Sequence, residues 1–239
     1  MYEMKKILLF FLLCFCAVSV VGQVSAAPEV TDSAMPRKQV LLETTKGRII
    51  VELYNETPRH RDNFLKLVAK GYYDGNLWHR VIADFMIQTG DSTTRHAQPG
   101  ASVGDYDLGY KIPAEIVFPR YFHKRGALAA AREGDRDNPG RASSASQFYI
   151  VYGNTFSTMG LDRVQQKLDT IDGGKIQLTP EIRDHYMKYG GTPHLDGQYT
   201  VFGEVVEGLN VVRDIDFVDT DDYDRPVEDV RIIRATIVR

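Results

Sequence analysis

The chain has 239 residues, of which 43% are hydrophobic and 26% are charged, and its formal net charge is −3. This length and balance are typical of an ordinary folded protein that can bury a core of useful size. The slightly negative total charge argues against nucleic acid as a partner and against attraction to an anionic membrane surface.

The first 26 residues have the order of a secretory signal peptide. Lys5 and Lys6 precede an apolar run over residues 7–21, and short side chains at 24–26 favour cleavage after Ala26. The run covers about 15 residues, whereas a membrane-spanning helix needs ~20, so we expect no stable membrane anchor after cleavage. The predicted localisation is export to the periplasm, with full secretion as the alternative.

Both cysteines of the chain, Cys14 and Cys16, lie in this segment. Leu13 and Phe15 precede them where a lipid-attachment motif needs a small residue, so a lipid-anchored protein is the less favoured alternative. After cleavage the chain would contain no cysteine, which excludes a disulfide, a thiol nucleophile and a thiolate metal site.

A flexible lead and a β-hairpin are predicted next. Residues 27–38 contain Pro, Ser and Ala without an apolar period, which is typical of a flexible segment. Over residues 40–54, two short strands flank a Lys-Gly turn. Ile49, Val51 and Leu53 alternate with residues on the other face, so we expect the second strand to bury one face.

One helix and several short strands follow the hairpin. Thr57 and Pro58 predict the start of the helix, with Thr57 as its N-cap, and Gly71 predicts its end. Short apolar segments bounded by Gly, Asp or Pro predict strands at residues 76–91, 126–132 and 147–152. The end of the chain predicts a strand at 198–206, a helix at 209–215 and a strand at 230–238.

Residues 154–193 interrupt this pattern with a helical period. The first helix is predicted from apolar residues at helical spacing, Leu161, Val164, Leu168 and Ile171. The second begins at Thr179-Pro180 and carries Ile182, Tyr186 and Tyr189. We therefore expect a helical insertion in a single domain over residues 39–239. Many short strands with few helices predict a mainly β fold, either a barrel or a sandwich, which periodicity alone does not distinguish.

Motifs for metal, nucleotide or nucleophile chemistry are missing. No two of the six histidines have metal-ligand spacing on one element, and there is no nucleophile elbow, phosphate loop or dinucleotide fingerprint. The acidic run at residues 219–224 lacks the spaced ligands of a calcium loop and predicts a solvated turn. We expect neither a metal nor a cofactor.

The informative stretch is residues 78–91, Trp-His-Arg-Val-Ile-Ala-Asp-Phe-Met-Ile-Gln-Thr-Gly-Asp. Alone, it predicts a pair of apolar strands in which Arg80 makes a structural salt bridge. Two further motifs follow in order, Gly-Ala-Leu-Ala-Ala-Ala-Arg at 126–132 with Ser-Ala-Ser-Gln-Phe-Tyr-Ile at 144–150, and Leu-Asp-Gly-Gln-Tyr-Thr-Val-Phe-Gly at 195–203. Together, from about residue 40 to 239, they resemble the cyclophilin family, interrupted only by the insertion.

The resemblance implies a fold, an activity and a set of site residues. The fold is an eight-stranded antiparallel β-barrel capped by two helices, and the activity is cis-trans isomerisation of X-Pro bonds without a cofactor. The implied catalytic residues are Arg80, Phe85 and Gln88. The implied substrate-binding residues are His79, Met86, Ala131, Arg132 through its backbone, Gln147, Tyr149, His194, Leu195 and Tyr199. The implied partners are proline-containing polypeptides, folding exported proteins among them.

These residue types suit the chemistry. Amide resonance sets an isomerisation barrier of ~18–20 kcal/mol. A cation that donates to the prolyl nitrogen favours the twisted bond, and Arg80 does this without losing its charge. An apolar pocket holds the proline ring while the other side of the bond rotates, so the twisted state is bound preferentially.

Three positions depart from the family pattern: Tyr149 where Phe is common, His194 where many members have Trp, and Tyr199 where many have His. We expect the Tyr149 hydroxyl to make the pocket slightly more polar and His194 to weaken binding of cyclosporin. We expect these three departures to affect inhibitor sensitivity and substrate preference more than activity.

Two other classes of function remain open. The first is a non-catalytic peptide-binding chaperone with the same groove, against which the pairing of Arg80 with Gln88 argues. The second is an assembly protein that works through residues 154–193. We expect this insertion to form a helical hairpin beside the groove and to affect which protein substrates fit. Its replacement by a short linker is then expected to leave small-peptide isomerisation largely intact.

Overall fold

The computed structural model describes residues 35–239. The predicted signal peptide, residues 1–26, lies outside the described residues, and so does most of the predicted lead, residues 27–38. The last residues of that lead are held against the barrel, because the carbonyl of Lys38 accepts from the amide of Leu53 at 2.8 Å. Within the described residues, no helix is both long and apolar enough to span a membrane.

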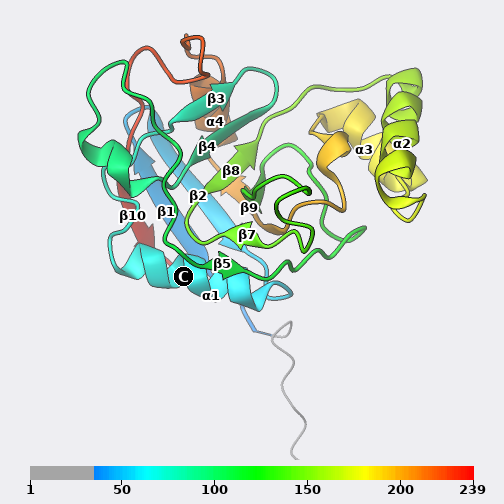
Figure 1. Ribbon diagram of the computed structural model, residues 1–239, viewed down its shortest axis with the longest axis horizontal. Coiled ribbons are helices and arrows are strands. Elements are labelled where there is room, and N and C mark those ends of the chain that lie inside the picture. Colours follow the sequence, from blue (N-terminus) through cyan, green and yellow to red (C-terminus); the bar gives the residue numbers. More distant parts are fainter. Residues whose placement is uncertain (1–34) are drawn as a thin grey trace, which may run out of the picture. The chain divides into compact units, whose positions relative to one another are not determined.

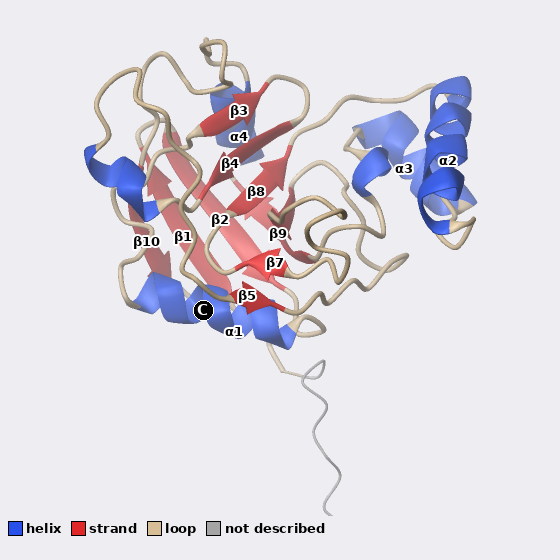
Figure 2. Ribbon diagram, viewed as in Figure 1, coloured by secondary structure: helices blue, strands red, loops and turns tan. Residues whose placement is uncertain are grey.

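Eight strands form one antiparallel sheet (Figure 2). In spatial order they are β10 (Ile232–Ile237), β1 (Gln39–Thr44), β2 (Gly47–Leu53), β9 (Val201–Glu207), β6 (Ala127–Ala130), β8 (Phe148–Val151), β4 (Met86–Thr89) and β3 (Arg80–Ile82). A separate two-stranded sheet joins β5 (Lys111–Ile112) to β7 (Ser143–Ser144).

The large sheet curls so that the segments next to its two edge strands, β3 and β10, contact each other. The amide of Trp78, before β3, donates to the carbonyl of Val230, before β10, at 2.9 Å. The amide of Val81, in β3, donates to the carbonyl of Asp224 at 2.7 Å. These bonds satisfy backbone groups that an open edge would expose. The predicted eight-stranded antiparallel fold is confirmed as a curled, barrel-like sheet, and the sandwich alternative is wrong.

Two helices cover the ends of the curled sheet (Figure 1). Helix α1 (Pro58–Ala69) buries Phe64, Leu67 and Val68, and α4 (Leu209–Asp216) buries Val211, Val212 and Ile215. These side chains join a single core with Ile49, Val51 and Leu53, whose predicted burial is confirmed. Pro58 starts α1 and Thr57 occupies its N-cap position, as predicted, but the Thr57 hydroxyl donates to the carbonyl of Tyr54 at 3.3 Å and makes no capping bond to the helix.

The insertion forms two packed helices to one side of the sheet (Figure 1). Helices α2 (Thr158–Asp172) and α3 (Pro180–Tyr189) begin with the side-chain caps Ser157 and Thr179. They share a separate apolar cluster that includes Leu161, Leu168 and Tyr186. The predicted inward positions of Ile171 and Tyr189 are wrong, since their exposed fractions are 46% and 60%. Both lie in the last turn of their helix, beyond the cluster.

Two short 3-10 helices complete the described secondary structure, η2 (Ser92–His96) and η3 (Pro193–Leu195). The predicted strand at residues 76–91 is a hairpin of β3 and β4. Its turn contains Asp84 with φ of 60°, a left-handed conformation that few residues other than Gly adopt. This turn presents the next residue, Phe85, at the end of β4.

Candidate active site

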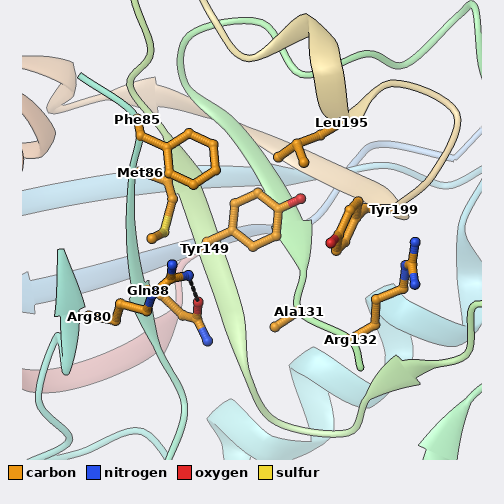
Figure 3. Close-up of a pocket in the computed structure, with 9 residues that line it drawn as sticks. All are labelled: Arg80, Phe85, Met86, Gln88, Ala131, Arg132, Tyr149, Leu195 and Tyr199. Carbon is orange, nitrogen blue, oxygen red and sulfur yellow. Dashed lines mark hydrogen bonds between the residues drawn. The ribbon is translucent and has the colours of Figure 1, made fainter. Parts of the chain in front are cut away.

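A pocket of about 210 Å³ lies on the outer face of the sheet. Figure 3 shows the nine side chains that line it, Arg80, Phe85, Met86, Gln88, Ala131, Arg132, Tyr149, Leu195 and Tyr199. All nine belong to the residues that the resemblance singled out. Three others from that set, His79, Gln147 and His194, do not line the pocket.

Strand register explains why residues distant in sequence meet here. Arg80 pairs with Gln88 across β3 and β4, and Gln88 pairs with Tyr149 across β4 and β8. Paired residues of neighbouring antiparallel strands point to the same face, and that face recurs every second residue. Met86, two residues before Gln88, therefore joins the pocket face, while the intervening Ile87 is buried in the barrel core.

Arg80 stands at the rim of the pocket. Its Nη1 donates to Oε1 of Gln88 at 3.5 Å, and its Nε donates to Oδ2 of Asp224 at 3.3 Å. The Arg80 and Asp224 side chains are 43% and 42% exposed. The predicted salt bridge exists, but it is half open to solvent. The guanidinium keeps further N–H groups with which to reach a bound peptide.

Gln88 and Gln147 form one hydrogen-bonded chain with Arg80. Figure 3 shows the bond between Arg80 and Gln88 as a dashed line. On its other side, Nε2 of Gln88 donates to Oε1 of Gln147 at 2.9 Å. Nε2 of Gln147 donates to the carbonyls of Gly104 and Tyr106, at 2.8 and 3.0 Å. This sequence of donors and acceptors fixes the orientation of both amides, with the Gln88 oxygen turned toward Arg80. Gln147 thus orients Gln88 from beside the pocket.

Apolar and aromatic side chains form the rest of the pocket wall. Met86 and Tyr149 are buried, and Phe85, Leu195 and Tyr199 pack against them half-buried. Figure 3 shows Arg80 and Gln88 on one side of Tyr149 and Leu195 with Tyr199 on the other. His194 stacks on the outer side of this wall, with its ring centroid 5.4 Å from that of Phe85. The pocket therefore places a cation across from an apolar wall.

The Arg132 side chain is fully engaged. Its Nε donates to the carbonyl of Gln198 at 2.8 Å, and its Nη1 lies 2.6 Å from Oδ1 of Asp135. The guanidinium carbon also stacks 4.4 Å from the centre of the Tyr199 ring. The Arg132 side chain is only 2% exposed, which favours the backbone contact with a peptide that the resemblance implies.

His79 lies outside the pocket lining, beside Gly104, whose carbonyl accepts a hydrogen bond from Gln147. It is 4% exposed and lines a different pocket, with Tyr223 and Arg225. It directly precedes Arg80, and neighbouring residues of an extended chain point to opposite faces. Burial lowers the pKa of His79 to about 4. His79 is therefore not part of the pocket lining, and its substrate-binding role stays a prediction of the resemblance.

The Tyr149 hydroxyl does not make the pocket more polar as expected. It lies 3.0 Å from Nε2 of His123, a buried residue behind the pocket. Burial raises the pKa of Tyr149 well above its usual value. Neither His123 nor Asp224 was found by sequence reasoning. Asp224 belongs to the predicted acidic turn, but nothing in the sequence indicates that this turn reaches Arg80.

Comparisons with known proteins show the family to which this fold belongs. Residues 39–237 match the family model "Cyclophilin type peptidyl-prolyl cis-trans isomerase/CLD". The chain is 34% identical over 197 residues to peptidyl-prolyl cis-trans isomerase ppi1 of Schizosaccharomyces pombe, covering 82% of this chain and 96% of that protein. It is also 34% identical to human peptidyl-prolyl cis-trans isomerase-like 1, covering 85% of this chain and 94% of that protein.

Solved structures show the same fold. A crystal structure of a Cryptosporidium parvum cyclophilin type peptidyl-prolyl cis-trans isomerase aligns with a TM-score of 0.60 at 24% identity, covering 85% of this chain and 99% of that one. The same protein in the presence of the dipeptide Ala-Pro aligns with a TM-score of 0.58. The chain belongs to the cyclophilin-type peptidyl-prolyl cis-trans isomerases, and it isomerises X-Pro bonds in proline-containing peptides.

Proposed function

We propose that this isomerase accelerates X-Pro isomerisation during the folding of exported proteins, with the periplasm as its location. The observation that carries the catalytic part is the placement of Arg80 across one pocket from the side chains of Leu195 and Tyr199. The export part rests on the order of charges, apolar run and short residues in 1–26.

Arg80 is the catalytic cation in this proposal. The apolar wall holds the proline ring, and an Arg80 N–H donates to the prolyl nitrogen as the amide twists. That donation is strongest when the nitrogen lone pair leaves the amide resonance, so it stabilises the transition state more than the ground state. Gln88 keeps the guanidinium oriented, and Gln147 holds Gln88.

Three variants test the catalytic role of Arg80 in an assay of X-Pro isomerisation with residues 27–239. Arg80→Ala is expected to lower kcat/KM by about two decades, the range found when one preorganised donor is removed. Arg80→Lys keeps the charge but not the planar guanidinium, and should recover only part of the rate. Arg163→Ala, on the exposed side of α2, is the matched control. Full activity in Arg80→Ala would contradict the mechanism.

The export proposal has a separate test. Residues 1–38 are fused to a reporter enzyme that is active only after its disulfides form outside the cytoplasm. Replacing Leu8 and Leu9 by Asp in the same fusion should abolish reporter activity, because it breaks the apolar run. Mass spectrometry of the exported protein should give a chain that begins at Ala27. A chain that begins at an acylated Cys14 or Cys16 would instead show a lipid-anchored protein.

A further inference from the structure

The helical insertion has one buried polar residue at its centre. Tyr186 of α3 has an exposed fraction of 0% and packs in the cluster formed by α2 and α3. Its ring lies edge-on to Phe122, with the centroids 5.5 Å apart. A buried tyrosine hydroxyl needs a hydrogen-bond partner, and its partner here lies outside the insertion.

That partner begins a chain of hydrogen bonds that ends at the proline pocket. The Tyr186 hydroxyl lies 2.7 Å from Oδ2 of Asp196, and Oδ1 of Asp196 lies 2.8 Å from the His123 amide and 3.0 Å from His123 Nδ1. His123 Nε2 lies 3.0 Å from the Tyr149 hydroxyl. All four side chains are buried, none with more than 4% of its surface exposed.

One arrangement of protons satisfies every member of this chain. Burial raises the pKa values of Tyr149 and Tyr186 well above their usual value, so both hydroxyls keep their protons. A carboxylate at Asp196 only accepts, so Tyr186 and His123 Nδ1 both donate to it. His123 Nε2 is then a lone-pair acceptor, and we assign the last bond as donated by Tyr149.

Two members of this hydrogen-bond chain, Tyr149 and Asp196, belong to or adjoin walls of the pocket. Tyr149 lines the pocket directly, and Asp196 directly follows Leu195, which lines it too. The segment before Asp196 is a single turn of 3-10 helix, closed by the bond from the Leu195 amide to the Thr192 carbonyl at 3.0 Å. A turn this short has little stability of its own, so its position depends on the anchor at Asp196.

We propose that Tyr186 is a positioning residue for the isomerase, which acts on the proline pocket through Asp196 and His123. This inference rests on the proposed function of the pocket. It gives the insertion a part in the reaction with small peptides as well as with proteins. Fully satisfied buried networks of this kind hold their members in one geometry, and removal of one donor loosens the rest.

The test compares Tyr186→Phe with Tyr189→Phe in the protein as purified from the expressing cell. Tyr186→Phe keeps the ring and removes only the hydroxyl. Tyr189 is the matched control, since it lies on the same helix and is 60% exposed. With a short peptide that has a single X-Pro bond, Tyr186→Phe is expected to lower kcat/KM about five- to tenfold, the effect of one buried donor. Tyr189→Phe should match the unmodified protein.

The effect of Tyr186→Phe should appear in KM, with kcat changed by no more than about twofold. The reason is that the pocket walls at Tyr149 and Leu195 hold the proline ring equally before and during rotation of the X-Pro bond. Arg80→Ala, by contrast, should lower kcat. The double variant Tyr149→Phe with Tyr186→Phe should lose little more than either single variant, since both cut one chain. Additive losses, or a kcat/KM for Tyr186→Phe equal to that of the control, would overturn the inference.

A second measurement decides the matter if Tyr186→Phe does not fold. The unmodified protein is titrated with the same peptide, and the NMR signals of the Tyr186 and Tyr189 rings are followed. Coupling is reciprocal, so filling the pocket should shift the Tyr186 signals at the concentration that saturates the pocket and leave those of Tyr189 in place. Unmoved Tyr186 signals would overturn the inference. An active wild type with an inactive Arg80→Ala would at the same time uphold the proposed function.

Discussion

The sequence leaves two interpretations of Arg80 open, a structural salt bridge and a cation that acts on the substrate, and Arg80 has features of both. Its ion pair with Asp224 is half exposed, and pairs of this kind contribute about 0–1 kcal/mol to stability. Such a pair does not hold the barrel together, so a structural salt bridge does not explain why a cation stands beside Met86 and Gln88. It does orient the guanidinium over the pocket.

Residue roles could be predicted where they follow from alternation along a strand. Arg80, Gln88 and Tyr149 share one face because their strands are paired, and the family motifs already contain that register. The same alternation turns His79, which the resemblance included, away from the pocket lining. His123 and Asp196 could not be predicted, because their hydrogen bonds connect loops whose positions depend on the whole fold.

Asp216 at the end of α4 makes stability depend on pH. It is fully buried, its Oδ2 accepts from the Asp84 amide at 2.7 Å, and its Oδ1 has no partner among the described residues. Burial is the main cause that raises the pKa of Asp216 to about 6 from its usual 3.8. The folded state therefore binds this proton more tightly than the unfolded state does.

The sign of the effect follows from that difference. The contribution of Asp216 to stability is complete below pH 3.8 and is lost as the pH rises through about 6. We expect Asp216→Asn to remove this loss, so its stability relative to the unmodified protein should increase between pH 5 and pH 7. Urea unfolding at both pH values measures the difference, with the exposed Asp214→Asn as control. Equal shifts for Asp216→Asn and Asp214→Asn would show that Asp216 titrates normally.

At the scale of elements, prediction worked where a helix or strand has a local signal. Thr179 caps the second helix of the insertion, whose start the Thr-Pro pair predicts, and the buried positions of Leu161 and Leu168 follow from a simple period. Ile171 and Tyr189 fit the same period but lie past the packing partner, which a period does not show. The position of β9 between β2 and β6 likewise comes from non-local pairing.

Deletion of the insertion is now expected to impair the reaction with small peptides. Replacing residues 154–192 by a short Gly/Ser linker removes Tyr186 and exposes Phe118 and Phe122, which pack against the helices. It also removes the bond from the Thr192 amide to the His123 carbonyl at 2.9 Å. The sequence alone predicts that small-peptide activity survives this deletion, and the buried contacts reverse that expectation.

The measurement is kcat/KM for a short X-Pro peptide beside the refolding rate of a protein substrate. We expect the deletion to lower kcat/KM for the short peptide at least about fivefold, the effect of one lost buried donor. The control is Met159→Gln with Met187→Gln, two exposed residues that lie on the surface of the helices. It should leave the peptide reaction unchanged and alter only protein refolding. A deletion variant with normal peptide activity would show that the pocket does not depend on the insertion.

At the scale of the whole molecule, the curled sheet brings together three distant parts of the chain. Arg80 and Gln88, Ala131 and Tyr149, and Leu195 and Tyr199 meet because β3, β4, β8, β6 and β9 are consecutive neighbours. Composition and periodicity gave no order of strands, so without the family resemblance this pocket could not have been assembled from the sequence. The family resemblance supplied the order of the strands. It did not include the hydrogen-bond network that runs from Tyr149 through His123 and Asp196 to Tyr186.

A catalyst built only from an arginine and an apolar pocket should work without any added group. Arg80 keeps its charge at all ordinary pH values, and the twisted amide needs no acid, base or nucleophile. Both cysteines lie at positions 14 and 16, within the predicted signal peptide. In residues 35–239, the structure has no cluster of three or more His, Cys, Asp or Glu side chains able to hold a metal.

We therefore expect residues 27–239 to keep their full rate in EDTA, after treatment with a thiol-alkylating reagent, and across pH 6–8. The same peptide assay measures all three conditions, and Arg80→Ala gives the background rate. Loss of activity in EDTA that an added divalent metal restores would show that a metal takes part in the reaction. A rate that titrates near pH 7 would show that a group other than Arg80 controls the pocket.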